Sequence, residues 1–571
     1  MLRFFISIHA RQVGSLALAT VVTVAACAAP TGQDRGRASQ GPSTQRSTPG
    51  TPARLTAAIT GNPPMLNRDF ATGHRRVQGL AEVGKLLNSP LSDADAHGAL
   101  QPILAEAVPS VENERWHVFP DGRMETVWKI RPGVTWHDGA PFTADDLVFT
   151  SEVEQTPDLP LVIDPAWDAV DGIDVLDRQT AVVRWKRPWV DADLMFANPY
   201  PKHLLQQALE QDPGALPSHP AFGDAFVGTG PFRVREFVRD SHVTMEANEQ
   251  FALGRPRLDE IEVRFIPDPN TLAANILAGE VQLTLGASVP LELAVSIKDQ
   301  WNEGTLKTRP IDNVVAIWPQ LQNPRPAVIG DARFRRALWQ AIDRQLLVDT
   351  IQAGLAPIAY GKLPPTAPEY ADTESAVVRY PYDPRAAARA IEELGYAKAT
   401  DGFVRDASGV VLSVELRTGG LEVAQKALFP VRDAWQQVGV KVETVVVPPQ
   451  QYQDGEYRAT RPGFELSRHA AGVSALQYYH SRTIPGSWNR WTGGNKPRYE
   501  SPEMDALLDE LDVTIPRPAR IELLRKILRI ASEQVINLYL FYDVGPTLIS
   551  NRVRGVESGS VVNEAHLWDV Q

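Results

Sequence analysis

One stretch near the C-terminus gathers side chains whose chemistry suits the binding of a polar molecule. Aromatic rings offer flat apolar faces, while guanidinium, imidazole and amide groups make directed hydrogen bonds. Around a pocket, such groups suit sugar rings, aromatic side chains or carboxylates. Core packing explains the two tryptophans equally well, and the arginine could belong to a structural ion pair. The candidate ligand-binding residues are Arg468, His469, Tyr478, Trp488, Asn489 and Trp491.

Patterns for catalysis, metal binding or phosphate binding are missing from the sequence. There is no Gly-x-Ser-x-Gly nucleophile motif, and His137-Asp138 lies in a segment whose residues favour a turn. The 11 histidines show no ligand spacing, and an approach of His469 to His480 is a weak alternative. Gly228-Thr229-Gly230 is followed by Pro231, where a phosphate loop would need free amide groups. We expect no catalytic residue, no cofactor and no metal, with an extracellular hydrolase as the rival class.

The N-terminus predicts a processing signal. Two arginines accompany an uncharged apolar run, Val13 to Ala26, which is shorter than the roughly 20 residues of a spanning helix. The run ends in Val24-Ala25-Ala26-Cys27, which resembles a bacterial lipobox, and Cys27 is the one cysteine of the chain. We expect residues 1–26 to be a lipoprotein signal peptide and Cys27 to carry the lipid. An ordinary signal peptide with an incidental cysteine is the alternative.

Composition limits the remaining chain. Residues 27–52 are rich in Ser, Thr, Pro and Gly without a large apolar side chain, which predicts a flexible tether. The formal charge of −12 argues against a nucleic-acid partner. A content of 43% hydrophobic and 22% charged residues is ordinary for globular domains. Because no later segment is long, apolar and uncharged, we expect an anchored protein that does not span the membrane.

Hydrophobic periodicity and turn residues predict mixed α/β structure. Thr143 is expected to cap a helix whose first turn holds Asp145 and Asp146. Gly395 and Gly439 are expected to end helices. Strands are predicted at 54–59, 232–238, 243–247, 261–266, 281–285, 440–447 (a buried strand) and 537–542, and helices at 271–279, 331–351, 384–394, 423–438, 501–511 and 517–531.

Several sequence strings occur in one order along the chain. They are Leu104–Glu106, Trp128–Phe149 (WKIRPGVTWHDGAPFTADDLVF), Gly228–Val234, Arg255–Ile261, Leu277–Val281, Asp331–Leu338 and Ala341–Arg344. Together they resemble the family 5 extracytoplasmic solute-binding proteins, which include oligopeptide-, dipeptide- and nickel-binding lipoproteins of ABC transporters.

This resemblance implies an α/β, two-lobed periplasmic-binding-protein-like fold (type II, cluster C, with an extra subdomain) and a ligand cleft between the lobes. The chain would cross between lobes near Thr284–Ser288 and Leu538–Val544. The expected division is lobe 1 at 53–285 with an inserted subdomain at about 90–205, lobe 2 at 286–538, and a return to lobe 1 at 539–571.

The resemblance also implies a function. We expect a monomeric, extracytoplasmic lipoprotein on the cell membrane that captures a peptide-like or glycan-like solute and delivers it to ABC permease subunits. Many peptide-binding members carry an aspartate that pairs with the peptide amino terminus, and the corresponding segment Phe464–Gln477 lacks it. Peptides with free amino termini are therefore in doubt. An oligosaccharide or glycopeptide carrier, or an envelope sensor without a transport role, remains an alternative.

Overall fold

The computed structural model describes residues 52–67, 69–70, 77–95, 98–157, 159, 166–557 and 562–571. The predicted signal peptide, Cys27 and nearly all of the predicted tether lie outside the described residues. Pro52–Gln571 forms a compact unit of its own. None of the helices within the described ranges is long and apolar enough for a membrane span.

A ten-stranded mixed sheet runs through this unit in the order β16-β15-β17-β12-β18-β11-β1-β10-β9-β8. In its first half, β1 is parallel to β10 and β11, and β8, β9 and β10 are antiparallel. In its second half, β15 is parallel to β16 and β17. The strands are β1 (Arg54–Ile59), β8 (Phe232–Val238), β9 (His242–Ala247), β10 (Glu260–Phe265), β11 (Leu283–Thr284), β12 (Gly304–Pro319), β15 (Ser413–Thr418), β16 (Lys441–Val446), β17 (Phe464–Ala470) and β18 (Leu538–Ser550).

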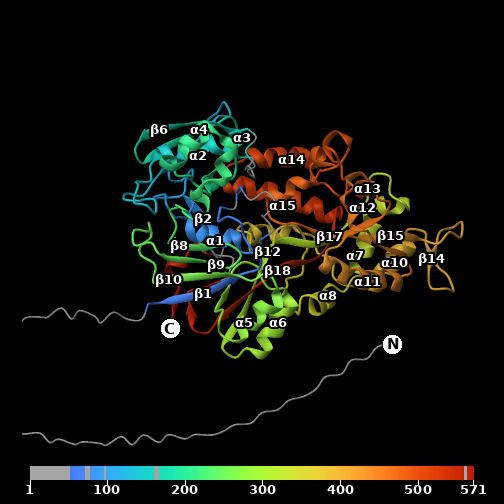
Figure 1. The fold of residues 1–571 in the computed structure, drawn as a ribbon. Coiled ribbons are helices and arrows are strands. Elements are labelled where there is room, and N and C mark those ends of the chain that lie inside the picture. Colours follow the sequence, from blue (N-terminus) through green and yellow to red (C-terminus); the bar gives the residue numbers. More distant parts are fainter. Residues whose placement is uncertain are drawn as a thin grey trace, which may run out of the picture. The chain divides into compact units, whose positions relative to one another are not determined.

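Strands β12 and β18 pass from one half of the sheet to the other (Figure 1). Gly304–Pro310 pairs with Val544–Ser550 beside β11, whereas Val314–Ile317 pairs with Leu538–Tyr542 beside β17. The lobe crossing expected near Thr284–Ser288 stays a prediction, while the chain passes between the two halves of the sheet within β12. Its side chains alternate toward solvent at the start and are continuously buried at the end, so a single period does not describe the strand.

A separate four-stranded antiparallel sheet, β4-β5-β7-β6, builds the subdomain inserted into the first half. Its core contains the fully buried Trp128, Trp136 and Trp185. Thr143 precedes the adjacent helix as predicted, and its backbone N–H donates to Asp146 Oδ2 at 2.8 Å. The elements are β4 (Trp116–Val118), β5 (Met124–Lys129), β6 (Val170–Asp177), β7 (Thr180–Trp185), α2 (Ala144–Glu154), α3 (Ala166–Ala169) and α4 (Lys202–Gln211).

Among the helices of the second half, one predicted helix is divided in two, and the short α9, α12 and α13 were not predicted. The segment predicted as one helix at 331–351 forms two, because Asp343 accepts a hydrogen bond from Leu346 N–H at 3.0 Å and starts a new helix. The predicted buried strand at 440–447 is an edge strand with several exposed side chains. The helices are α7 (Ala332–Gln340), α8 (Arg344–Ile351), α9 (Tyr370–Thr373), α10 (Pro384–Glu393), α11 (Glu422–Gln437), α12 (Pro449–Gln453) and α13 (Gly455–Ala459).

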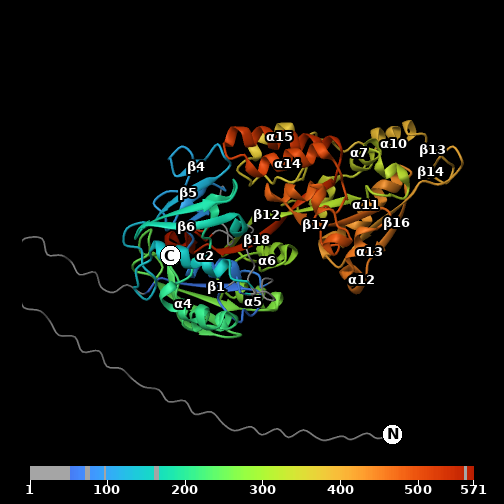
Figure 2. The ribbon, with the colours of Figure 1, turned by 90° about the horizontal axis from the view of Figure 1, so that it is seen from above.

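Helices α14 (Pro502–Val513) and α15 (Arg517–Glu533) lie together in both views (Figures 1 and 2). Ile515, in the loop between them, packs into the core of the four-stranded subdomain. The two halves thus contact each other away from the crossing strands. The remaining helices are α1 (Leu80–Leu87), α5 (Pro269–Leu277) and α6 (Leu291–Gln300), of which α5 and α6 share a core with Leu548 of β18.

Candidate functional site

Strand β17 carries two candidate residues side by side in sequence, and they contact different partners. Successive strand residues point to opposite faces of a sheet. Arg468 forms an ion pair with Asp543 of β18, a residue that is only 5% exposed. His469 instead packs edge-on against the rings of Trp318 and Tyr478, with centroid distances of 5.1 and 4.7 Å. The charge of Arg468 is therefore already matched within the chain.

His469 is held as a neutral imidazole. Its Nε2–H donates to the carbonyl of Gly494 at 3.3 Å, so its Nδ1 carries a lone pair, and this buried atom has no hydrogen-bond partner among the described residues. Burial, and then the nearby charge of Lys362, lowers the pKa of His469 to about 3. The residue can accept a hydrogen bond and is not a cation at neutral pH.

Tyr478 completes a group that the sequence did not reveal. The Nζ atom of Lys362 lies 5.0 Å from the ring centre of Tyr478 and 5.2 Å from that of Tyr479. We call Lys362, His469, Tyr478 and Tyr479 the lysine–aromatic cluster. The ring of Tyr478 can take this position only because residue 494 is a glycine: a Cβ on Gly494 would lie 2.1 Å from the Tyr478 ring.

Lys362 was not among the residues predicted from the sequence. It is the one charged residue between Leu355 and Pro365, and that isolation was the available signal. The side chain is 2% exposed, and its backbone carbonyl accepts the N–H of Gly472 at 2.8 Å. Burial lowers the pKa of Lys362 to about 7.

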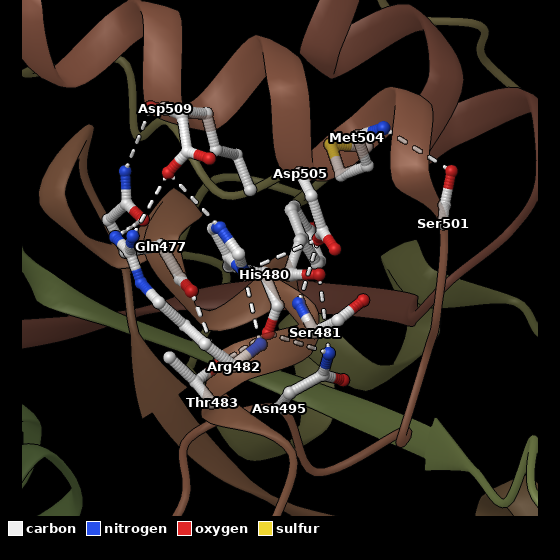
Figure 3. Close-up of polar contacts among 12 residues, drawn as sticks. Gln477, His480, Ser481, Arg482, Thr483, Asn495, Ser501, Met504, Asp505 and Asp509 are labelled. Carbon is white, nitrogen blue, oxygen red and sulfur yellow. Dashed lines mark hydrogen bonds and ion pairs between the residues drawn. The ribbon is translucent and has the colours of Figure 1, made fainter.

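A polar network fixes the segment that bears the two tyrosines (Figure 3). His480 Nε2 lies 3.2 Å from Asp509, and Ser481 N–H donates to Asp505 at 2.8 Å, which ties the segment to α14. The buried amide of Asn495 donates to the carbonyl of Tyr479 at 3.2 Å. The backbone that bears the two tyrosines is therefore held from both sides, as a preorganised binding surface requires.

The loop with the two tryptophans lies further along the chain. The side chain of Asn489 closes a turn, donating to Ile484 O at 2.8 Å and accepting Gly486 N–H at 2.9 Å. The ring of Trp488 is 69% exposed and lies over Gly486, whereas the Cβ and backbone of the half-buried Trp491 lie close to Gly455. Trp491 also has a left-handed backbone at φ 62°, unusual for a bulky residue.

Motifs that were considered for other chemistry have structural partners. His137 accepts Gly228 N–H at Nδ1 (3.2 Å) and donates from Nε2 to Gly230 O (3.1 Å), and burial lowers its pKa to about 4. The N–H of Gly230 donates to Leu87 O at 2.9 Å. This turn therefore joins two segments and does not offer free amides to a phosphate. Within the described residues, no group of three or more His, Cys, Asp or Glu is placed to hold a metal ion.

The architecture defines a class: an α/β binding protein whose two lobes are joined by paired crossing strands. A family model for the bacterial extracellular solute-binding proteins, family 5 (middle), matches residues 101–483, and the chain belongs to this family. The chain is 23% identical over 463 residues to the oligopeptide-binding protein AppA of Bacillus subtilis, covering 80% of each chain. It is 26% identical over 483 residues to heme-binding protein A of Haemophilus influenzae, covering 80% of this chain and 81% of that protein.

Solved structures agree on the fold. NikA from Brucella suis, in complex with Fe(III)-EDTA, matches with a TM-score of 0.72 at 19% identity, covering 91% of this chain and all of that one. The predicted two-lobed fold and family are confirmed.

Proposed function

We propose that this protein is the substrate-binding component of an ABC importer and that it captures peptides or a related small polar solute. Family membership combined with two lobes joined by β12 and β18 carries the proposal. A ligand that touches both lobes only in the closed state favours closure by that difference in binding. The permease would recognise the closed form.

Relatives such as the oligopeptide-binding protein AppA support the peptide ligand. The heme-binding relative has a similar sequence identity to this chain, so relatives at this level of identity bind different ligands. Arg468, His469, Tyr478, Trp488, Asn489 and Trp491 remain the predicted contacts, and Lys362 and Tyr479 join them. The lobe boundaries at 53–285, 286–538 and 539–571 also remain a prediction, since one continuous sheet does not define where a rigid lobe ends.

Thermal unfolding of the mature protein against panels of peptides, glycans and metal chelates tests this function. A ligand at 100 times its Kd adds about 2.7 kcal/mol to the free energy of unfolding. Mass spectrometry should recover the bound ligand chemically unchanged, because we propose no catalytic residue. Conversion of the ligand would indicate an enzyme, and silence across all panels would contradict a transport role.

We also propose that the protein is a monomeric lipoprotein, anchored on the outer side of the cell membrane through Cys27 with residues 27–52 as tether. Cys27→Ala should release the protein from the membrane fraction of the producing cells. Ser43→Ala, within the tether, is the matched control and should leave it there. Membrane retention of the Cys27→Ala protein would contradict the lipid anchor.

A further inference from the structure

Lys362 is a buried cation without an acidic partner among the described residues. Its side chain is 2% exposed, and burial alone shifts its pKa, with no carboxylate acting on it. Removing an ammonium group from water is costly unless an opposite charge or hydrogen-bond acceptors replace the solvent. A lysine kept in such a place is poised for a partner that arrives from outside the chain.

The neighbouring groups leave this charge unmatched. The ring faces of Tyr478 and Tyr479 attract the ammonium through their π electrons, but the rings carry no negative charge that would neutralise it. His469 is neutral, and Lys496 adds further positive charge nearby. The buried acids of the adjoining strands are committed, Glu465 to Arg458 at 3.2 Å and Asp543 to Arg468.

We infer that Lys362 binds an anionic group of the ligand, and that for a peptide this group is the C-terminal carboxylate. The inference rests on the proposed function and names the ligand chemistry at the same site. The unpartnered Nδ1 of His469, a hydrogen-bond acceptor, suits an N–H close to that carboxylate, as the last peptide unit provides. Tyr478 and Tyr479 hold the ammonium in place in the absence of ligand.

The matched probes are a random pentapeptide library with free C-termini and the same library with C-terminal amides. Each is equilibrated with the mature protein, and bound peptides are quantified by native mass spectrometry. A charge-assisted hydrogen bond corresponds to roughly a ten- to hundredfold preference for the free carboxylate. Lys362→Met should abolish that preference, whereas Lys398→Met, an exposed lysine, should leave it intact.

Proton uptake gives a second readout. Because the Lys362 pKa is about 7 without ligand, much of the ammonium is neutral at pH 8, and a bound carboxylate should restore its proton. Isothermal titration in buffers of different ionisation enthalpy should show uptake approaching one proton for the wild type and none for Lys362→Met. Lys362→Gln provides a second variant with a polar side chain.

The outcomes separate the two proposals. Equal binding of both libraries by the wild type, or a preference that survives in Lys362→Met, overturns the role of Lys362 and leaves the transport function standing. Binding of neither library contradicts the peptide ligand itself, and the inference falls with it.

Discussion

Arg468 of β17 forms an ion pair with Asp543 of β18, next to the point where β18 passes between the two halves of the sheet. Asp543 is 5% exposed, whereas the Arg468 side chain is 36% exposed. The pair therefore neutralises a buried carboxylate at the junction of the lobes. Its first effect is on the stability of that junction, and any contact with a ligand is additional.

Arg468→Met should destabilise the protein, because it leaves the Asp543 carboxylate buried and unpaired. Fully buried pairs lose about 3–5 kcal/mol when one partner is removed, and the partial exposure of Arg468 reduces our expectation to roughly 2 kcal/mol. Urea unfolding measures the loss. Arg123→Met, which breaks an exposed pair with Asp121, should cost much less than Arg468→Met. Equal losses in both variants would contradict the structural role of the pair.

The sequence predicted the family, the two-lobed fold and seven of the ten strands of the large sheet, because local periodicity and the ordered motifs can be recognised along the whole chain. It did not predict β12, whose pattern of burial changes midway, or the break at Asp343, where a cap outweighs continuous helical spacing. Within the site, Lys362 and Tyr478 are more than one hundred residues apart. Their contact depends on tertiary packing of a loop against β17 and could not be inferred from spacing.

His469 should make the protein less stable in acid. Its pKa is lowered from 6.5 to about 3, so between these values the unfolded chain binds a proton that the folded protein does not. The free energy of unfolding therefore falls as the pH decreases, by up to about 1.4 kcal/mol per pH unit. His469→Gln should reduce this slope between pH 6 and 4, while His137 maintains a part of it.

The exposed His117 provides the control for that measurement. A His117→Gln protein should retain the acid destabilisation that His469 causes. If the His469→Gln protein keeps the wild-type slope, the pKa of His469 does not differ between the folded and the unfolded chain, and the prediction is wrong.

Gly230 should not tolerate a side chain. A Cβ at this position would lie 2.4 Å from Leu86 O and 2.5 Å from the carbonyl carbon of Leu87, both in the backbone. Gly230→Ala should therefore cost roughly 2–3 kcal/mol in thermal unfolding. Gly420→Ala, where no atom lies within 4 Å of the added Cβ, should stay within about 1 kcal/mol of the wild type. A stable Gly230→Ala protein would mean that the turn is not a packing requirement.

Trp488 and Trp491 should separate into a surface residue and a packing residue. Trp488 is 69% exposed, so Trp488→Ala should change stability by less than about 0.5 kcal/mol, as at most surface positions. Trp491 is half-buried, and loss of its indole ring in Trp491→Ala should cost more, roughly 1–2 kcal/mol. An aromatic ring exposed without a stabilising role is free to contact a ligand, so Trp488→Ala should weaken ligand-induced stabilisation in the same unfolding assay. If that stabilisation is unchanged, Trp488 is not a ligand contact, and the binding surface is centred on the lysine–aromatic cluster.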